Sequence, residues 1–437
     1  MKIALVCPAS LPATQFGGIV FLAVDLAREI SEMGHNVTIY TTDLDFSNGP
    51  NKFNKKLPRI EKFEKFLINR THVWFSLKLF FVNTSMSKEI ENDKPDIIHT
   101  IGLRSFQSII AWRVSKKLNI PLVVSDQGGL TTHPFLAESG FFLKTLYKIQ
   151  DFFIRKIIND ASVISVANEY EQKIFSSLNK KSRIKIIRNG VNLKKLVSKH
   201  SFKEKYQINS NFILFVGRFS KSKGIETLLN AFSIVKNELK DSEIHLVIMG
   251  VDFGYQSEME KLIKKLNLSE EIKVIKNPPR DDVISAYGES EFLVLPSQWE
   301  LSPLVPLESF AFKKPVISTN SHGIPYTVQN NKNGILVEPE NSLELSNAIV
   351  KLLNDSELRE KLGLSGYNFV NEECNCVSMA KNSLKLYEDI LEEMQNKLNN
   401  ELSLIHISEP TSPRLSSYAV FCLKKRGGGG GGGGGGG

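Results

Sequence analysis

Two glutamates, Glu300 and Glu308, enclose the run ELSPLVPLE directly after a short apolar segment. Ser302 followed by Pro303 predicts a helix whose N-cap is the serine and whose first turn contains the proline. Glu300 then precedes this helix and Glu308 lies in its second turn, so the two carboxylates bracket the helix start. Carboxylates in this arrangement can accept hydrogen bonds from hydroxyl groups, or can act as the acid and the base of a glycoside hydrolase.

The start of this predicted helix adds a binding site for an anion. The backbone N–H groups of Leu304 and Val305 have no partner inside the helix, and such groups bind phosphate at helix N-termini. A phosphate site between two carboxylates favours a diphosphate with hydroxyl groups on both sides, those of a sugar on one and those of a ribose on the other. A glycoside hydrolase needs no phosphate site, so the sequence favours hydroxyl recognition over hydrolysis.

Arg218 and Lys223, in GRFSKSKG, supply two cations on another loop. The loop follows the strand predicted at FILFV and precedes a helix predicted from about Ile225. Anionic ligands bind at the carboxyl ends of strands in parallel sheets, and cations there would neutralise the charge that builds on a departing phosphate. A P-loop is excluded because Ser222 replaces its second glycine and Gly224 replaces its hydroxyl residue. A solvated basic loop is the alternative.

The first half of the chain contains weaker candidates. Gly17 and Gly18 open a helix predicted after the first strand, which allows either close approach of the backbone to a ligand or simply a tight helix start. They do not form GxGxxG, so a nicotinamide dehydrogenase is poorly supported. His99 follows the strand predicted at PDIIH and is either a catalytic or acceptor-contacting group or a structural histidine. Asp43 and Asp45 lack a third carboxylate nearby, so we predict a solvated loop and no metal site.

Strands must position these loops, and the predicted strands are short, apolar and rich in β-branched residues. Apolar runs without alternation indicate sheets covered on both faces, and their alternation with helical patterns indicates parallel α/β layers. The first series is KIALVC, NVTIYTT, PDIIHT, PLVVSD, ASVISVA and RIKIIRN, and the second is FILFVG, IHLVIMG, IKVIK, FLVLPS and KPVISTN. A polar stretch between the two series predicts two domains of the α/β class, as the chain length also suggests.

The predicted boundaries follow this pattern. We expect a first domain over 1–195, a linker over 196–211, a second domain over 212–376 and a final helix over 377–398. Residues 402–437 are set apart, because LSLIHISEPT and SYAVFCLKKR back-translate to text that resembles sequencing adapters and a run of glycines follows. We predict that this segment is not native, and a flexible low-complexity linker is the alternative.

Composition excludes several classes of protein. The net charge of +8 falls to +5 (8 − 3) without residues 402–437, which contain four Lys or Arg and one Glu (4 − 1 = 3). The remaining cysteines, Cys7, Cys374 and Cys376, make neither a disulfide framework nor a zinc site, so a reducing cytoplasm is expected. The first apolar run is too short for a signal peptide, and no run reaches the ~18 apolar residues of a transmembrane helix.

With these parts assembled, residues 1–395 resemble the retaining GT-B glycosyltransferases of group 1, or family 4. The resemblance rests on GRFSKSKG, on the spacing of Glu300 and Glu308 and on AFKKPVISTNSHGIP, with support from GG at 17–18, DIIHTIGL and IIRNGVN. It implies two Rossmann-like domains that face a cleft, the first for the acceptor and the second for the nucleotide-sugar donor. It also implies that the final helix crosses back to the first domain.

The resemblance further implies a role for each predicted site residue. Arg218 and Lys223 would hold the donor diphosphate, while Glu308 would hold the ribose hydroxyls and Glu300 the transferred sugar. Gly18 would let the backbone approach the phosphates and the acceptor. Enzymes of this family retain the anomeric configuration, through attack from the face that the phosphate leaves, and they need no divalent metal.

The acceptor side departs from the family at Gln127, in SDQGGL, where many relatives have His or Arg. The expected function is transfer of a sugar from UDP, GDP or dTDP to a glycan or lipid-linked acceptor, in cell-surface polysaccharide synthesis and without a cofactor. The alternatives are a nucleotide-sugar 2-epimerase, a phosphorylase, and a catalytically idle relative that binds nucleotide sugars.

One segment suggests a membrane partner. Residues 52–78 contain eight Lys or Arg and two Glu (8 − 2 = +6), interleaved with aromatic residues. Such a surface can bind anionic lipid, so peripheral contact at the inner face of the membrane is expected for a cytoplasmic enzyme with a lipid-linked acceptor. A solvated helix face is the alternative. No nucleic-acid recognition motif accompanies the charge, so nucleic acid is not an expected partner.

Overall fold

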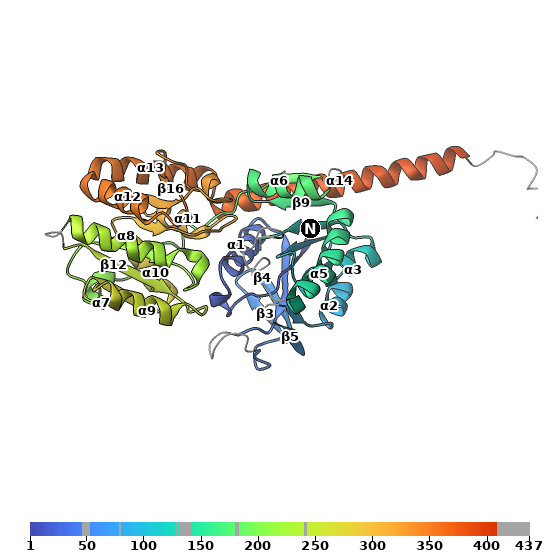
Figure 1. Cartoon of the computed structure of the whole chain (residues 1–437). Helices are drawn as coiled ribbons and strands as arrows, with labels where there is room; N and C mark the ends of the chain where they lie inside the picture. Colours follow the sequence, from blue (N-terminus) through green and yellow to red (C-terminus); the bar gives the residue numbers. More distant parts are fainter. Residues whose placement is uncertain are drawn as a thin grey trace, which may run out of the picture. The chain divides into compact units, whose positions relative to one another are not determined.

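The chain is described by a computed structural model that covers residues 1–45, 53–77, 80–127, 130, 141–179, 183–239 and 243–408. It divides into two compact units, Met1–Tyr387 and Glu388–Gly437. Two large sheets lie in the first unit, and helices flank both of them (Figure 1). The predicted α/β class with two Rossmann-like sheets is therefore confirmed.

The first sheet has eight strands in the order β10-β9-β8-β7-β1-β2-β4-β3. All its pairings are parallel except that of β3 with β4. Its strands are β1 (Lys2–Val6), β2 (Asn36–Thr42), β3 (Ile60–Phe63), β4 (Phe66–Thr71), β7 (Ile97–Ile101), β8 (Leu122–Ser125), β9 (Val163–Val166) and β10 (Ile184–Ile186). The strands β7, β8 and β9 are buried along their whole length, which explains why their sequences are apolar without alternation.

The second sheet has six parallel strands in the order β13-β12-β11-β14-β15-β16. They are β11 (Phe212–Val216), β12 (His245–Gly250), β13 (Ile272–Lys276), β14 (Leu293–Leu295), β15 (Val316–Thr319) and β16 (Gly334–Val337). Alternate residues of β11 pack into separate cores, since Ile213 and Phe215 join one cluster and Phe212 and Leu214 join another. A strand that fills a core on each face must be apolar at every position.

The flanking helices of the first sheet are α1 (Gly18–Glu32), α2 (Met86–Asp93), α3 (Phe106–Leu118), α5 (Phe141–Asp160) and α6 (Glu169–Leu178). Those that follow are α7 (Phe202–Tyr206), α8 (Ile225–Glu238), α9 (Gln256–Lys265), α10 (Arg280–Glu289), α11 (Leu304–Ala311), α12 (Ser342–Asn354), α13 (Ser356–Glu372) and α14 (Cys376–Ser408). Short 3-10 turns are η1 (Thr14–Phe16), η2 (Lys221–Lys223) and η3 (Ile324–Tyr326). A separate two-stranded sheet pairs β5 (Phe75–Leu77) with β6 (Phe80–Val82).

The strands β3 to β6 and β16 are not indicated by the local sequence pattern. These strands are three to six residues long, and β4 buries the polar residues Asn69, Arg70 and Thr71. Two of these residues have distant partners: Arg70 Nη2 donates to the carbonyl oxygen of Leu11 at 2.8 Å, and the Thr71 hydroxyl accepts from Nδ2 of Asn83 at 2.6 Å. A local hydrophobic pattern cannot reveal such strands, because their burial depends on long-range partners.

The chain passes between the two sheets twice, and the two connections touch. The Val191 N–H donates to the carbonyl oxygen of Cys374 at 3.0 Å, and the Cys376 N–H donates to that of Val191 at 3.0 Å. A Cβ on Gly190 would lie 2.3 Å from the backbone of Asn375, so only glycine fits there. The two connections therefore form one backbone-to-backbone junction.

The final helix returns to the first sheet, as predicted. Tyr387 of α14 is hydrogen-bonded to Nδ1 of His99, on β7, at 2.6 Å. The Cys376 thiol donates to Oε1 of Glu29, on α1, at 3.3 Å. The helix was expected over 377–398 and extends over Cys376–Ser408. Of the segment predicted to be non-native, residues 409–437 lie outside the described residues.

Candidate active site

The loop after β11 brings its cations to the end of β14. Gly224, which precedes α8, has φ +67, and a Cβ there would lie 1.9 Å from the carbonyl oxygen of Pro296. Glycine is therefore required both for the conformation and for the close approach. Pro296 directly follows β14, so the loop of Arg218 and Lys223 packs against the segment that leads to Glu300.

Lys223 forms an ion pair with Glu300. Its Nζ donates to Oε1 of Glu300, and the hydroxyl of Ser297 donates to the same oxygen at 3.2 Å. The guanidinium of Arg218 lies over the ring of Phe253, 4.9 Å from its centroid. Within the described ranges, Arg218 has no hydrogen-bond acceptor. One predicted cation thus orients a predicted carboxylate, and the other is left available to an anion.

The helix after Glu300 begins one residue later than predicted. Pro303 is the N-cap of α11, which starts at Leu304, and no side chain caps it. Ser302 is therefore not the N-cap, because proline takes this position with extended backbone angles. The N–H groups of Leu304 and Val305 remain the first of the helix and have no acceptor within it. The predicted anion site at this helix start keeps both of its donors.

Gly323, in the loop that follows β15, contacts the segment between Glu300 and α11. The Gly323 N–H donates to the carbonyl oxygen of Glu300 at 3.0 Å. A Cβ on Gly323 would lie 1.7 Å from the carbonyl oxygen of Leu301. Similarly, a Cβ on Gly250 would lie 1.8 Å from the carbonyl oxygen of Gly217. These two glycines have negative φ or extended angles, so close packing of backbone, not a turn, requires them.

Glu308 is buried, and its carboxylate accepts three hydrogen bonds from two residues of α10. Arg280 donates to both of its oxygens, at 3.0 Å through Nη1 and at 2.5 Å through Nη2, and the hydroxyl of Tyr287 donates to Oε2 at 2.9 Å. Neither Arg280 nor Tyr287 was among the residues predicted for the site. The signal in the sequence is weak, since Arg280 is one cation in PPRDD, at the start of a helix. Only the fold brings this helix to α11.

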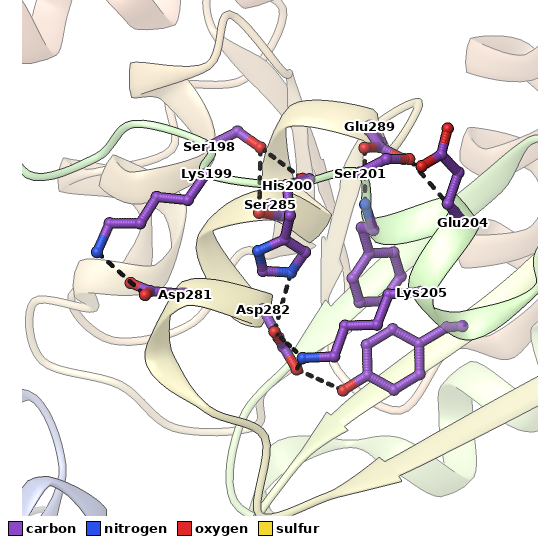
Figure 2. A network of polar contacts seen from close by, with 12 residues as sticks. Ser198, Lys199, His200, Ser201, Glu204, Lys205, Asp281, Asp282, Ser285 and Glu289 are labelled. Carbon is purple, nitrogen blue, oxygen red and sulfur yellow. Dashed lines mark hydrogen bonds and ion pairs between the residues drawn. The ribbon is translucent and has the colours of Figure 1, made fainter.

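A polar network holds α10, the helix that begins with Arg280, against the linker segment (Figure 2). Asp282 accepts hydrogen bonds from Lys205 Nζ at 2.6 Å and from the Tyr206 hydroxyl at 2.5 Å, and its Oδ1 lies 3.0 Å from His200 Nε2. Burial opposes ionisation of Asp282, but these partners lower its pKa below the usual value. At the other end of α10, Glu289 accepts the first N–H groups of α7. The network fixes α10 and thereby the position of Arg280.

The glycine pair of the first sheet meets the start of α11. Gly17, the N-cap of α1, has φ +116, which favours glycine, and Gly18 begins the helix. A Cβ on Gly18 would lie 3.2 Å from Cδ1 of Leu304. The first turns of α1 and α11, one from each sheet, are therefore in contact. The structure thus brings together Gly17, Gly18, Leu304 and the loop that contains Glu300.

Two asparagines of the first half contact the same loop. Asn168, the N-cap of α6, donates through Nδ2 to the carbonyl oxygen of Leu301 at 2.7 Å. Asn189 lies 3.5 Å from the carbonyl oxygen of Ser302 and exchanges two 3.0 Å hydrogen bonds with the amide of Gln127. Neither asparagine was among the residues predicted for the site. Gln127 thus supports the loop of Glu300 through Asn189.

Two family models match the chain in sequence. The family described as Glycosyltransferase Family 4 matches residues 16–195, and the family described as Glycosyl transferases group 1 matches residues 198–369. The second match contains both loops of the predicted site, and the first contains the glycine pair. The chain belongs to the group 1, or family 4, glycosyltransferases.

Individual proteins agree with this assignment. An uncharacterized glycosyltransferase of Methanocaldococcus jannaschii is 27% identical over 84% of this chain and 94% of its own length. The capsular polysaccharide biosynthesis glycosyltransferase CapM of Staphylococcus aureus is 29% identical over 54% of this chain and 63% of its own length. The structure of Anabaena HepE in complex with UDP-glucose superposes with a TM-score of 0.68, at 16% identity, over 89% of this chain and all of HepE. The fold is that of the GT-B glycosyltransferases.

His99 does not reach the site of the glycosyltransferase. It is buried, its Nδ1 is hydrogen-bonded to Tyr387, and its Nε2 is hydrogen-bonded to the Ser125 hydroxyl at 2.7 Å. Burial lowers the pKa of His99 to about 3, so the ring is neutral at physiological pH. Both nitrogens are engaged inside the protein, which assigns His99 to the packing of α14 on β7. We do not include it in the proposed acceptor site.

The aspartates of the glycosyltransferase's DLD run are buried, contrary to the predicted solvated loop. Asp43 accepts hydrogen bonds from the Val73 N–H at 3.1 Å and contacts Nδ1 of His72 at 2.5 Å. Asp45 accepts from Nδ2 of Asn54 at 2.9 Å. Across the described ranges, no three His, Cys, Asp or Glu side chains gather into a group that could hold a metal ion.

The basic segment 52–78 forms strands in the glycosyltransferase, so the helix face considered for it is wrong. Several of its charges have partners, in the pairs Arg59–Glu89, Lys65–Glu32 and Arg70–Glu61. Trp74 and Phe75 are 65% and 51% exposed. Lys52 and Lys78 lie outside the described residues. No helix in the part of the chain that is described is both long and apolar enough to span a membrane.

Proposed function

We propose that this glycosyltransferase moves a sugar from a nucleoside diphosphate sugar to a hydroxyl group of a glycan or lipid-linked acceptor, with retention of configuration and without a divalent metal. The observation that carries the proposal is the contact of Gly18 with Leu304 beside the Lys223–Glu300 ion pair. Cations, free N–H groups and carboxylates then belong to loops and helix starts that contact one another. A departing diphosphate and a transferred sugar require these groups.

The cations and the helix start would bind the diphosphate. The ammonium group of Lys223 has three N–H donors, and Glu300 accepts only one of them, so two can reach phosphate oxygens. Arg218 offers its guanidinium without a competing acceptor in the described chain. The N–H groups of Leu304 and Val305 complete a site that becomes more favourable as negative charge builds on the leaving group.

The carboxylates would bind hydroxyl groups on either side of this diphosphate. Glu308 has about four acceptor positions, of which Arg280 and Tyr287 use three, so one position on Oε1 can accept a ribose hydroxyl. Glu300 accepts Lys223 and Ser297 at Oε1, and among the described residues none donates to its Oε2. That oxygen is the one we assign to a hydroxyl of the transferred sugar.

Retention follows from attack on the face that the diphosphate leaves. The acceptor oxygen forms the new bond to the anomeric carbon as the bond to the diphosphate oxygen breaks. The acceptor proton passes to that departing oxygen, so no protein base is required. Arg218 and Lys223 would stabilise the diphosphate throughout, which is why we propose that no metal is needed.

Two of the compared proteins support the choice of donor and acceptor. HepE is described in complex with UDP-glucose, which favours UDP-sugars as the first donors to test. CapM is named for capsular polysaccharide biosynthesis, which favours a growing glycan or its lipid-linked form as the acceptor. A cytoplasmic site at the inner face of the membrane, where such acceptors are made, accords with the exposed Trp74 and Phe75.

A donor screen with a paired variant tests the proposal. Full-length protein is supplied with UDP-, GDP- and dTDP-sugars, with and without EDTA, and nucleotide release is measured. We expect release from one donor, unchanged by EDTA, and a fall of about 100-fold or more in kcat for Glu300→Gln with little change in nucleotide affinity. Glu340→Gln is the control, because Glu340 accepts a hydrogen bond from Gln298 at the surface. Full activity of Glu300→Gln contradicts the assignment.

Two further readouts complete the test. The anomeric coupling in the proton NMR spectrum of the product reports retention, and an inverted product contradicts the front-face mechanism. Sedimentation with anionic vesicles, compared between the wild-type protein and Trp74→Ser/Phe75→Ser, reports membrane contact. Equal sedimentation of the two proteins contradicts a role for this surface.

A further inference from the structure

Phe21 of α1 lies against the arginine that holds Glu308. The guanidinium carbon of Arg280 is 4.9 Å from the centroid of the Phe21 ring, within the distance of about 6 Å at which a cation is attracted to an aromatic face. The same guanidinium donates to both oxygens of Glu308. Arg280 therefore contacts a carboxylate of α11 and an aromatic ring of α1 at the same time.

The charge of α1 also acts on Arg280. Burial opposes ionisation of Arg280, but Glu308 raises its pKa above the usual value and Asp25 adds to this effect. Asp25 follows Phe21 by about one turn of α1, so the two side chains belong to one face of the helix. This face thus offers Arg280 both a ring and a negative charge.

The side chain of Arg280 needs such a contact more than its backbone does. The network on Asp282 already fixes α10, the helix that begins with Arg280 (Figure 2). An arginine side chain has several rotatable bonds, and a fixed backbone does not restrict them. The ring of Phe21 and the carboxylate of Glu308 restrict them together. Without the ring, the guanidinium can leave the position in which two of its N–H groups meet Glu308.

Asn168 of the first half contacts the segment that contains Glu300. Its Nδ2 donates to the carbonyl oxygen of Leu301, the residue after Glu300, at 2.7 Å. Its Oδ1 accepts from the Glu171 N–H at 3.1 Å and so caps α6. The residue is 1% exposed. Both ends of one buried amide are therefore used, the oxygen within α6 and the nitrogen on the loop before α11.

Two consecutive carbonyl oxygens of this loop accept from different halves of the chain. That of Glu300 accepts from the Gly323 N–H at 3.0 Å, and that of Leu301 accepts from Asn168. Leu301 is buried, so its carbonyl oxygen needs a donor from the protein. If Asn168 loses its N–H groups, the second sheet alone holds the backbone of Glu300.

We propose that Phe21 and Asn168 are positioning residues of the donor site. Phe21 fixes Arg280 and, through it, the ribose contact of Glu308. Asn168 fixes the loop of Glu300, which we assign to the transferred sugar. This inference rests on the proposed function, because it extends the donor site of that function into the first half of the chain. Each residue acts on a different glutamate, so their loss should affect different steps, donor binding for Phe21 and turnover for Asn168.

Phe21→Leu tests the first role, since leucine keeps an apolar side chain without the ring. UDP, then GDP and dTDP, are titrated calorimetrically into the full-length protein. We expect about fivefold weaker binding of the nucleotide that the wild-type protein binds, with kcat for nucleotide release within about twofold. Phe152→Leu is the control, because the ring of Phe152 also contacts a cation, Lys156, at 4.4 Å, but is exposed on α5.

Asn168→Thr tests the second role. Threonine has a similar size and also caps helices, but it has no amide N–H. We expect kcat to fall about tenfold, while nucleotide binding changes less than about threefold. Asn341→Thr is the control, since Asn341 caps α12 in the same way, by accepting from the Glu344 N–H at 3.0 Å. Asn168→Ser should give the same result and replaces Asn168→Thr if threonine lowers the melting temperature.

Trp299 belongs to the same loop and reports on it without turnover. In a Trp74→Phe/Trp112→Phe background it is the one tryptophan of the sequence. Asn168→Thr should raise its acrylamide quenching constant at least about 1.5-fold, because a loop that has lost a hydrogen bond opens more often. Phe21→Leu should leave this constant unchanged, since it acts on another element.

The two variants together decide the inference. Weaker nucleotide binding in Phe21→Leu alone, with slower turnover and stronger quenching in Asn168→Thr alone, supports both roles. Equal losses of binding and turnover in both variants, or effects no larger than in their controls, overturn the inference. If nucleotide sugars are turned over but the variants match their controls, only the positioning roles fail. If no nucleotide sugar is turned over, the proposed function fails, and calorimetry and fluorescence still test the two residues.

Discussion

The two glutamates of ELSPLVPLE have the same side chain but different surroundings. Glu300 is half-buried, takes one cation from a loop of the same sheet and keeps one oxygen without a donor in the described chain. Glu308 is buried between Arg280 and Tyr287. A carboxylate with a free oxygen can bind or release a ligand, whereas one locked by three donors serves as a rigid acceptor. This difference agrees with the roles that we propose for the pair, a sugar contact for Glu300 and a fixed ribose contact for Glu308.

Arg280 is the residue that gives Glu308 its position, and Arg280→Lys tests this. Lysine keeps the charge but loses the fork that contacts both carboxylate oxygens, so we expect about tenfold weaker nucleotide binding with a smaller change in kcat. Arg359→Lys is the matched control, because Arg359 pairs with Glu291, outside the proposed site. Titration calorimetry with UDP measures the effect. Equal loss in both variants would show that the fork at Glu308 has no special role.

Glu171 predicts a pH dependence of stability. Burial, with a smaller effect of Asp126, raises its pKa to about 8, while its unfolded pKa is near 4.5. The folded state therefore holds a proton that the unfolded state loses between these values. The contribution of Glu171 to the free energy of unfolding is fully present below pH 4.5. It is lost as the pH rises to 8, at up to about 1.4 kcal/mol per pH unit.

Glu171→Gln should remove this slope, because glutamine keeps the shape without the titration. Denaturant unfolding at pH 5, 6, 7 and 8 measures it. Glu344→Gln is the control, since Glu344 occupies the same position after the N-cap of α12 but lies near the surface. If the slope of Glu171→Gln equals that of the wild-type protein, the buried carboxyl is not its source.

At the scale of elements, the loop between β14 and α11 is positioned from both sides. Gly323 contacts it from the second sheet and Asn168 from the first, each through the carbonyl oxygens of the loop. In a similar way, the hydrogen bonds from Lys205 and Tyr206 to Asp282 hold α10 in place. Helices and strands thus hold loop residues in place. A site on loops can gain a precise geometry in this way.

Gly323→Ala should displace this loop. A Cβ at 1.7 Å from the Leu301 carbonyl oxygen forces a movement of about 1 Å or more, for which we expect at least about a tenfold loss in kcat and a loss of ~1–3 kcal/mol in stability. In contrast, a Cβ on Gly288, inside α10, meets nothing closer than 3.6 Å. Gly288→Ala should therefore stabilise by ~0.5–1 kcal/mol with activity intact. Similar effects of both substitutions on activity and unfolding would contradict the packing argument.

At the scale of the whole molecule, two connections and one helix join the halves of the first unit. The junction of Val191 with Cys374 and Cys376 lies between the sheets, and Tyr387 of α14 reaches His99 on β7. Met379, Ala380 and Tyr387 are buried, so this part of α14 belongs to the core of the first unit. The segment predicted not to be native, 402–437, begins beyond these buried residues.

Truncation separates these two parts of the C-terminal region. A chain that ends at residue 401 should keep its kcat and its Tm within about 2 °C, whereas a chain that ends at Asn375 should unfold or aggregate, since it loses the buried face of α14. Differential scanning calorimetry and the nucleotide-release assay measure both. A drop of more than about 5 °C on removal of 402–437 would show that this segment contributes to the fold.

The sequence by itself determined the α/β class and the loops of Arg218, Lys223, Glu300 and Glu308, because apolar strands, glycines and helix starts are local signals. Only the tertiary structure revealed the partners of those loops. Arg280 is 28 residues from Glu308, Asn168 is 133 residues from Leu301, and His99 is 288 residues from Tyr387. Contacts at such separations leave no periodic trace in a single sequence, since they depend on how the sheets fold together.

The same reason explains the errors. His99 follows a strand as a site residue would, yet α14 covers it, and Asp43 was expected in solvent, yet it is buried against the Val73 N–H. The basic aromatic segment had the composition of a surface helix, but its strands β3 and β4 complete the edge of the first sheet. Residue type and spacing therefore determined which groups could do chemistry, and packing between distant segments decided which of them are available to do it.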